Sequence, residues 1–206
     1  MLSSIDVSAL DTGDIMLFSG KGLGSAIIRW FTGSDWTHVA MVVRLDGVDE
    51  PLLLESNPGP ESADLFCGQP VAGISLVTVA RKLTDYRGEV VVRRREGAPI
   101  AARQHRLVQR LVRRLYRRPY RGYLWRQLRD VLRSSGRRDY SAMFCSELVA
   151  EFYRRLDWLP REVRTGRVVP AHFATDGLPL LQGALRPPVW LKSSAEKKSS
   201  LAVAGR

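Results

Sequence analysis

Cys145 and His38 are the two residues whose types and settings in the sequence could together carry out nucleophilic chemistry. Cys145 lies in YSAMFCSELVAEFYRRL, where the pattern predicts the first turn of a helix. Free backbone N–H groups and the helix dipole at that position favour the thiolate, which is the nucleophilic form of cysteine. A buried structural cysteine is an equally simple reading of this segment, because free cysteine packs well in protein cores.

His38 lies in DWTHVAMVV, at the start of an apolar segment typical of a strand. An imidazole beside a thiol can take its proton and later protonate the leaving group. A single histidine on a strand is also a common core residue, so the segment alone leaves both readings open. The other histidines are weaker candidates, because His105 falls on an arginine-rich helix and His172 follows Pro170 in a predicted loop.

Glu55 is a candidate for the third group of such a site, because it closes the apolar strand segment LLLES. A carboxylate can hold an imidazole in one tautomer and stabilise its charged form. His38 on the neighbouring strand is the partner that this carboxylate could reach. An exposed strand end in contact with solvent is the alternative reading of Glu55.

The elements that must position these residues follow one another as strands and then helices. Apolar and β-branched residues predict strands at 13–19, 37–45, 51–55, 74–80 and 88–94. A proline- and glycine-rich stretch from Asn57 to Gly73 predicts a surface loop. Helical spacing predicts helices at 22–32, 101–118, 123–134 and 142–157, before a loop-rich end. This order predicts an α+β fold with helices packed on one side of an antiparallel sheet.

Length and composition indicate one catalytic domain over residues 1–192 and a disordered basic tail over 193–206. The net charge of +11, carried mostly by arginine, favours anionic partners such as a lipid membrane or a cell-wall polymer. Solvated helix faces in an arginine-rich chain explain the same charge. We expect no metal and no cofactor, since the sequence lacks zinc-type cysteine spacing and a nucleotide-binding glycine motif.

The N-terminal segment MLSSIDVSALDTGD lacks a basic start and an apolar stretch, so the sequence predicts no signal peptide. No run approaches the length of apolar residues that a membrane-spanning helix needs. We therefore expect synthesis in the cytoplasm. Delivery to an envelope or to a target cell, with an immunity or delivery partner, is the further possibility that these features allow.

The segments GDIMLF, WTHVAMVV, LLLES and FCSELVAEFY, in this order, resemble the circularly permuted NlpC-type, YiiX-like papain fold. The resemblance runs from about Gly13 to Asp176 and includes VVPAHFATDG. It implies a permuted papain-like α+β fold in which the histidine strand precedes the cysteine helix. It also implies the site residues and their roles: Cys145 as nucleophile, His38 as general base and acid, and Glu55 as orienting group.

The same resemblance implies the backbone N–H of Cys145 as an oxyanion donor, with Asp14 or Tyr123 as a possible second donor. Cys67 has no partner in this scheme and is expected to be incidental. The aromatic residues near His38 predict either a substrate groove or simply core packing; they are Trp30, Phe31 and Trp36.

Several functions remain open from the sequence. The resemblance and the apolar segments around His38 and Cys145 favour a thiol hydrolase that releases acyl chains from phospholipid through an acyl-enzyme. The alternative substrate is an amide bond of peptidoglycan, as for many NlpC-type enzymes. A module without catalytic activity that binds membranes or nucleic acid is the non-enzymatic reading, and nucleic acid is the less expected of these partners.

Overall fold

The computed structural model describes residues 5–20, 34–59, 61–118 and 145–193. The strands in these ranges are β1 (Ile15–Ser19), β2 (His38–Val43), β3 (Leu52–Asn57), β4 (Gly73–Thr78), β5 (Glu89–Arg93), β6 (Arg95–Glu96), β7 (Ala184–Leu185) and β8 (Val189–Lys192). The α-helices are α2 (Val79–Asp85), α3 (Ala102–Leu115), α5 (Cys145–Arg155) and α6 (Pro170–Ala174), and the 3-10 helices are η1 (Val7–Ala9) and η2 (Thr165–Arg167). The helices predicted at 22–32 and 123–134, Trp30, Phe31, Tyr123 and nearly all of the predicted tail lie outside the described residues.

Six strands form one sheet in the order β4-β3-β2-β1-β5-β8, and every neighbouring pair is antiparallel. The two short strands β6 and β7 form a separate ladder. Five of the six strands of this sheet precede α3, α5 and α6 in sequence, and the arrangement agrees with the predicted α+β class.

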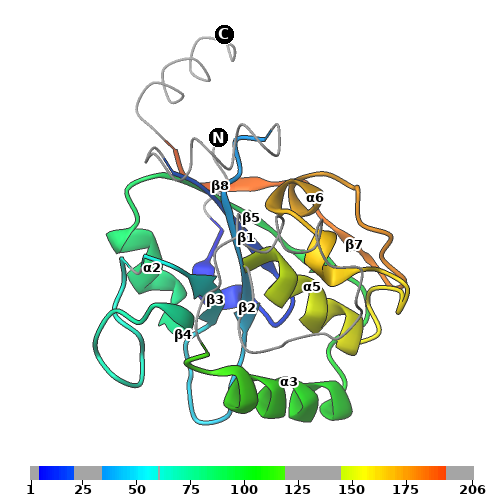
Figure 1. The fold of residues 1–206 in the computed structure, drawn as a ribbon, viewed down its shortest axis with the longest axis horizontal. Coiled ribbons are helices and arrows are strands. Elements are labelled where there is room, and N and C mark those ends of the chain that lie inside the picture. Colours follow the sequence, from blue (N-terminus) through cyan, green and yellow to red (C-terminus); the bar gives the residue numbers. More distant parts are fainter. Residues whose placement is uncertain (1–4, 21–33, 60, 119–144, 194–206) are drawn as a thin grey trace, which may run out of the picture.

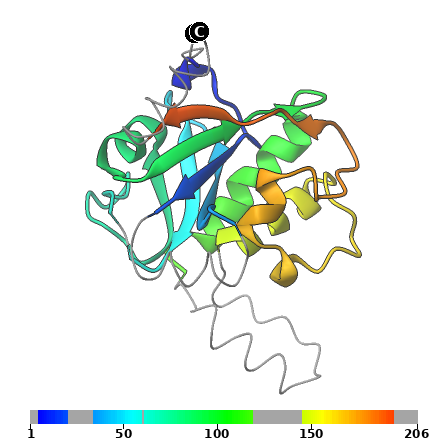
Figure 2. The same ribbon diagram turned by 90° about the horizontal axis from the view of Figure 1, so that it is seen from above.

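Both faces of the sheet are covered, which explains why its strands are apolar at nearly every position. Alternate strand residues, such as Leu17, Met41 and Leu54, share one core with residues of α3, α5 and α6. The residues between them, such as Phe18 and Leu53, share a second core with α2 and η1. Figures 1 and 2 show α2 on one side of the sheet and α5 and α6 on the other. The prediction of helices on one side only was therefore wrong for α2.

The strand predicted over 74–80 is two residues too long at its end, because Val79 already begins α2, a helix that the sequence did not predict. The strand β4 ends at Thr78, whose side-chain oxygen accepts a hydrogen bond from the Arg81 N–H at 3.2 Å and so caps the first turn of α2. Threonine is a favoured N-cap residue, but its β-branched neighbours in ISLVTVA favour a strand. Thr78 as an N-cap was the signal in the sequence that the strand ends and a helix begins.

The loop-rich end that was predicted contains α6 and the edge strand β8. Buried Arg93 fixes this end to β5, because its guanidinium donates hydrogen bonds to several groups there. The acceptors are the carbonyl oxygens of Phe173, Thr175, Leu185 and Arg186 and the carboxylate of Asp176.

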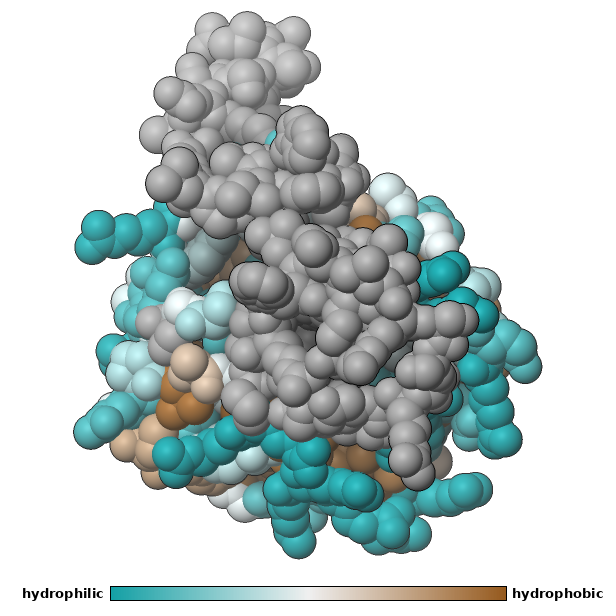
Figure 3. All heavy atoms as spheres, viewed as in Figure 1, coloured by the Kyte–Doolittle hydropathy of each residue, from teal (hydrophilic) through white to brown (hydrophobic). Residues whose placement is uncertain are grey.

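The helix α3 lies along the lower edge of the molecule as drawn in Figure 1. Its buried residues are Val108, Gln109, Leu111, Val112 and Leu115. Hydrophilic side chains extend from that lower edge in Figure 3. The apolar side of α3 therefore faces the core, and its arginines face outward.

Candidate active site

His38 and Glu55 lie at the end of the sheet where the pairing between β2 and β3 stops. The ladder between these strands ends at Met41 and Leu54, although β2 begins at His38 and β3 continues to Asn57. Both side chains point toward the same face of the sheet. His38 alternates in step with Ala40 on β2, and Glu55 with Leu53 on β3, and both of these apolar residues belong to the second core. This arrangement brings two polar side chains together at one end of two inner strands that are otherwise apolar.

Cys145 is the first residue of α5 and is buried against the first core. The helix packs on both β2 and β3, so its N-terminus lies at the end of their ladder. The backbone N–H groups of Val39 and Ser146 donate hydrogen bonds to the Cys145 sulfur. Within the described residues α5 begins at Cys145, which agrees with the prediction that Cys145 lies in the first turn of a helix.

The three predicted residues form one continuous chain of side-chain contacts. His38 Nε2 lies 2.8 Å from Glu55 Oε2, and the imidazole forms a second hydrogen bond with the Cys145 thiol. Because Glu55 occupies Nε2, Nδ1 is the ring nitrogen left to face the sulfur. The structure thus brings together all three residues that the sequence nominated.

Lys82 extends this chain and was missed by the sequence analysis. Its Nζ donates a hydrogen bond to Glu55 Oε1 at 2.8 Å, and its side chain is only 1% exposed. The ammonium group also lies 5.4 Å from the ring centre of Phe18 and 5.8 Å from that of Tyr86, within cation–π range. The sequence does hold a signal for a buried lysine at this position. Lys82 lies on the same side of α2 as Val79, and that side is apolar.

The contacts set the charge of each group. Burial lowers the pKa of His38, but the charge and hydrogen bond of Cys145, followed by those of Glu55, outweigh burial and raise it from 6.5 to about 9. Burial raises the pKa of Glu55, but the charge of Lys82 and the interactions with His38 lower it from 4.5 to about 2. Glu55 is therefore ionised at neutral pH, and His38 is protonated.

The thiol is shifted in the complementary direction. Burial raises the pKa of Cys145, but the charge and hydrogen bond of His38, with the N–H groups of Val39 and Ser146, lower it below its usual value. A lowered thiol pKa beside a raised imidazole pKa describes a thiolate–imidazolium pair that titrates as one unit. Such a pair is chemically able to attack an electrophilic carbon and to supply a proton afterwards.

Asp14 does not belong to this site, so its suggested place as an oxyanion donor was wrong. Its backbone carbonyl accepts from the Val42 N–H, whereas His38 pairs with Phe18 at the other end of the same strands. Four residues of strand correspond to about 13 Å. The Asp14 carboxylate instead accepts a hydrogen bond from the Arg95 backbone N–H at 2.8 Å, directly before the start of β1.

The remaining histidines and Cys67 also lie apart from the three-residue chain. His105 Nε2 is 2.8 Å from Asp46 Oδ1 on the protein surface, and His172 Nδ1 accepts from a backbone N–H at the start of α6. Cys67 is exposed in the loop before β4. Trp36 is half-buried and lies on Trp190, with ring centres 5.8 Å apart.

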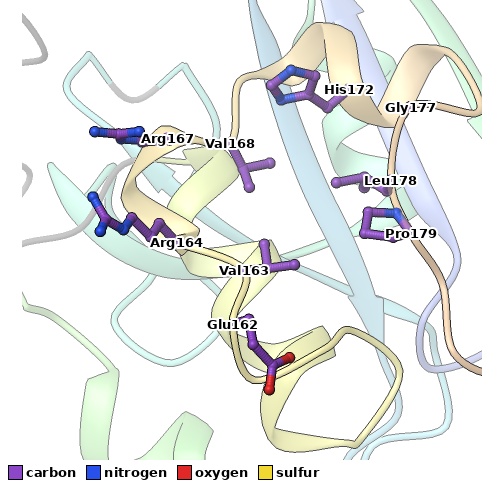
Figure 4. Close-up of a pocket in the computed structure, with 9 residues that line it drawn as sticks. All are labelled: Glu162, Val163, Arg164, Arg167, Val168, His172, Gly177, Leu178 and Pro179. Atoms are coloured by element: carbon purple, nitrogen blue, oxygen red, sulfur yellow. The ribbon is translucent and has the colours of Figure 1, made fainter.

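A surface hollow lies between η2 and the segment after α6. Figure 4 shows Val163 and Val168 on one side and Leu178 on the other, with Arg164 and Arg167 extending away from them. None of Cys145, His38 and Glu55 lines this hollow. It is joined to the cysteine helix through Ser146, whose hydroxyl donates to the Val168 carbonyl at 2.6 Å.

Comparison with known proteins gives a structural relative but no relative in sequence. No protein-family model and no curated protein match the chain. A solved structure titled as the metalloprotein yiiX from Escherichia coli O157:H7, DUF1105, matches with a TM-score of 0.52. The match is 16% identical and covers 90% of this chain and 98% of that one. The chain has a YiiX-like fold. At this identity the likeness concerns the fold alone.

Proposed function

We propose that this YiiX-like protein is a thiol hydrolase of the permuted papain-like type, with Cys145 as nucleophile, His38 as general base and acid, and Glu55 as orienting group. The observation that carries the proposal is the continuous chain Cys145–His38–Glu55–Lys82, whose His38 and Glu55 pKa values are about 9 and about 2. Shifts of this kind at a partly accessible histidine are typical of functional sites.

The first half of the reaction forms an acyl-enzyme. The Cys145 thiolate attacks the substrate carbonyl carbon, and the new C–S bond converts the carbonyl oxygen to an oxyanion. The backbone N–H of Cys145 is the proposed donor to that oxyanion. When the oxyanion collapses, the bond to the leaving group breaks, and His38 gives its proton to the leaving oxygen or nitrogen.

The second half releases the acyl group. Neutral His38 takes a proton from water as the water oxygen attacks the thioester carbon. The C–S bond then breaks, and the product acid leaves while Cys145 returns to the thiolate beside the imidazolium. Glu55 stabilises the imidazolium in both halves, and Lys82 holds the second oxygen of Glu55 in place at 2.8 Å.

Phospholipid is the substrate class that we favour. The half-buried pair of Trp36 and Trp190 provides an aromatic surface two residues before His38 in the sequence, which suits an acyl chain. The net charge of +11 suits an anionic headgroup. An amide bond of peptidoglycan is the alternative substrate, since the same chemistry cleaves either bond.

The mechanism contains no metal-dependent step. The yiiX structure is titled as that of a metalloprotein. Within the described ranges of this chain, no three side chains of His, Cys, Asp and Glu gather closely enough to hold a metal ion.

The described helices include none that is both long and apolar enough to cross a membrane. As a separate proposal, the protein acts on the surface of its substrate, either in the cytoplasm or after delivery.

The deciding experiment incubates the protein with phospholipid vesicles and digested peptidoglycan, followed by mass spectrometry of the products. Cys145→Ala tests the nucleophile, and Cys67→Ala is the matched control because Cys67 is an exposed cysteine outside the site. We expect fatty acid and lysolipid from the wild type and from Cys67→Ala only.

Three other results would change the proposal. Cleaved peptides without lysolipid would transfer the same mechanism to the cell wall. Product formation that survives Cys145→Ala would refute Cys145 as nucleophile. Absence of product together with an ordinary thiol titration at Cys145 would support a binding module without catalytic activity.

A further inference from the structure

The outward side of α3 carries a row of arginines that no acidic residue of the described chain neutralises. Arg103, Arg106, Arg110 and Arg113, here called the basic row, are spaced by three, four and three residues and therefore lie along one side of the helix. All four are exposed, and none forms an ion pair within the described ranges. The row is about 15 Å long, since a helix rises about 1.5 Å per residue.

Beside the C-terminal end of α3, the loop before β4 exposes two large apolar side chains. Leu65 and Phe66, here called the apolar tip, are 38% and 60% exposed. The Phe66 ring contacts the ring of Tyr116, the residue directly after α3, with centres 5.7 Å apart. The apolar tip therefore lies at the C-terminal end of the helix that carries the basic row.

Asp64 holds the apolar tip in place. Its carboxylate accepts hydrogen bonds from the N–H groups of Phe66 at 3.0 Å and Leu76 at 2.9 Å, and from the Tyr116 hydroxyl at 2.6 Å. One buried carboxylate thus connects the loop, β4 and the end of α3. The exposure of the tip is consequently built into the fold, because the loop cannot withdraw Phe66 without breaking these bonds.

This surface lies close to the candidate active site. The backbone N–H of Arg117 donates a hydrogen bond to the carbonyl oxygen of Ile74 at 2.8 Å, so the chain after α3 runs beside β4. The next residue of β4, Ser75, is the register partner of Glu55. Two strand spacings, or about 10 Å, therefore separate Glu55 from the end of α3.

We propose that the basic row and the apolar tip together form a docking surface for an anionic lipid bilayer. Proteins that lie on such bilayers place arginines at the level of the lipid phosphates and insert apolar side chains beside them. The apolar side of α3 is already buried in the core, so insertion must come from Leu65 and Phe66. Leu65 has no ring to stack on a base, and for this reason the surface suits lipid better than single-stranded nucleic acid.

The test measures co-sedimentation with vesicles and uses the Cys145→Ala protein, so that no result depends on hydrolysis. We expect binding to vesicles of equimolar phosphatidylglycerol and phosphatidylcholine, much weaker binding to pure phosphatidylcholine, and a loss of affinity as salt is raised. In the variant Arg106→Gln/Arg110→Gln/Arg113→Gln the affinity should fall about 100-fold, since each arginine near an anionic surface contributes roughly fivefold.

Two matched controls separate this surface from general charge and apolarity. Arg161→Gln/Arg164→Gln/Arg167→Gln removes the same charge from exposed arginines after α5 and should retain most of the affinity. Phe66→Ser should weaken binding roughly tenfold. Leu181→Ser should not, although Leu181 is 58% exposed. Circular dichroism of each variant establishes that it is folded.

Three results would overturn the proposal. The first is equal binding to neutral and anionic vesicles, and the second is an equal loss in the control triple variant. The third is tighter binding to a single-stranded oligonucleotide than to anionic vesicles, lost in the α3 triple variant, which would assign the row to nucleic acid. When the α3 triple variant is made in the protein that retains Cys145, its hydrolysis of a soluble short-chain ester should be unchanged, so failure of docking is distinguishable from failure of the active site.

Discussion

Removal of the His38 imidazole should strongly slow the reaction of Cys145 with alkylating agents below neutral pH. In the wild-type protein the thiolate persists because the imidazolium, with a pKa of about 9, lies beside a thiol whose pKa is lowered. Burial is the largest single influence on the Cys145 pKa and raises it; in His38→Ala only the N–H groups of Val39 and Ser146 remain to oppose it. The variant should therefore hold a neutral thiol over the range in which the wild type holds a thiolate.

The size of this effect follows from the shift of His38. A rise of its pKa from 6.5 to about 9 corresponds to about 3 kcal/mol of net favourable interaction with the imidazolium. A free thiol with a pKa of about 8.5 is only about 0.3% ionised near pH 6. Because thiolates of low pKa are intrinsically less nucleophilic, the advantage in rate is smaller than the advantage in ionisation. We expect alkylation of Cys145 near pH 6 to slow by about 100-fold in His38→Ala.

The assay is the rate of iodoacetamide alkylation between weakly acid and alkaline pH, followed by peptide mass spectrometry. Cys67 is an internal reference in the same molecule, because it is exposed and lies outside the pair. Its rate should be identical in the wild type and in His38→Ala. Equal pH profiles of Cys145 in the two proteins would refute the thiolate–imidazolium pair and, with it, the proposed activation of the nucleophile.

Three further predictions concern stability. Lys82→Met should lower the free energy of unfolding in urea by about 3–5 kcal/mol, because it leaves an oxygen of buried Glu55 without its partner; Glu55→Gln/Lys82→Met should recover most of this loss. Arg93→Met should cost at least about 3 kcal/mol through its lost carbonyl partners, whereas Asp176→Ala should cost less than about 1 kcal/mol because that carboxylate is 91% exposed. The stabilising contribution of His38 should be complete below pH 6.5 and lost as pH rises through about 9, and that of Glu55 complete above pH 4.5 and lost as pH falls toward about 2. Thermal unfolding against pH should show a plateau between pH 4.5 and 6.5; a steady slope across that interval would contradict these assignments.

The sequence alone predicted the sheet and the meeting of three residues, for physical reasons that can be named. His38 and Glu55 are polar residues at the ends of apolar strands, so each requires a partner, and neighbouring strands provide it at 2.8 Å. Cys145 begins a helix whose apolar stripe must face the sheet. That these residues catalyse a reaction stays a prediction.

The sequence could not predict the features that depend on distant partners. The strand β8 is only four residues long and follows two prolines, Pro187 and Pro188, so local rules indicate a loop; pairing with β5 and the anchor at Arg93 decide otherwise. Lys82 could be recognised only as a charge on an apolar helix side. Its partner, Glu55, is more than twenty residues away and on another element.

The separation of His38 and Cys145 along the chain has a consequence for biosynthesis. In the part of the chain that the structure describes, six strands and the whole of α3 precede α5, so a ribosome completes more than one hundred residues after His38 before it adds Cys145. At about 5–20 residues per second, this delay lasts roughly 5–20 s. Contacts of such long range also form slowly. Until α5 is made, the growing chain carries the imidazole of His38 without the Cys145 thiol, and the edge strand β8 is added only after α5. His38 and Cys145 therefore come together only late in synthesis.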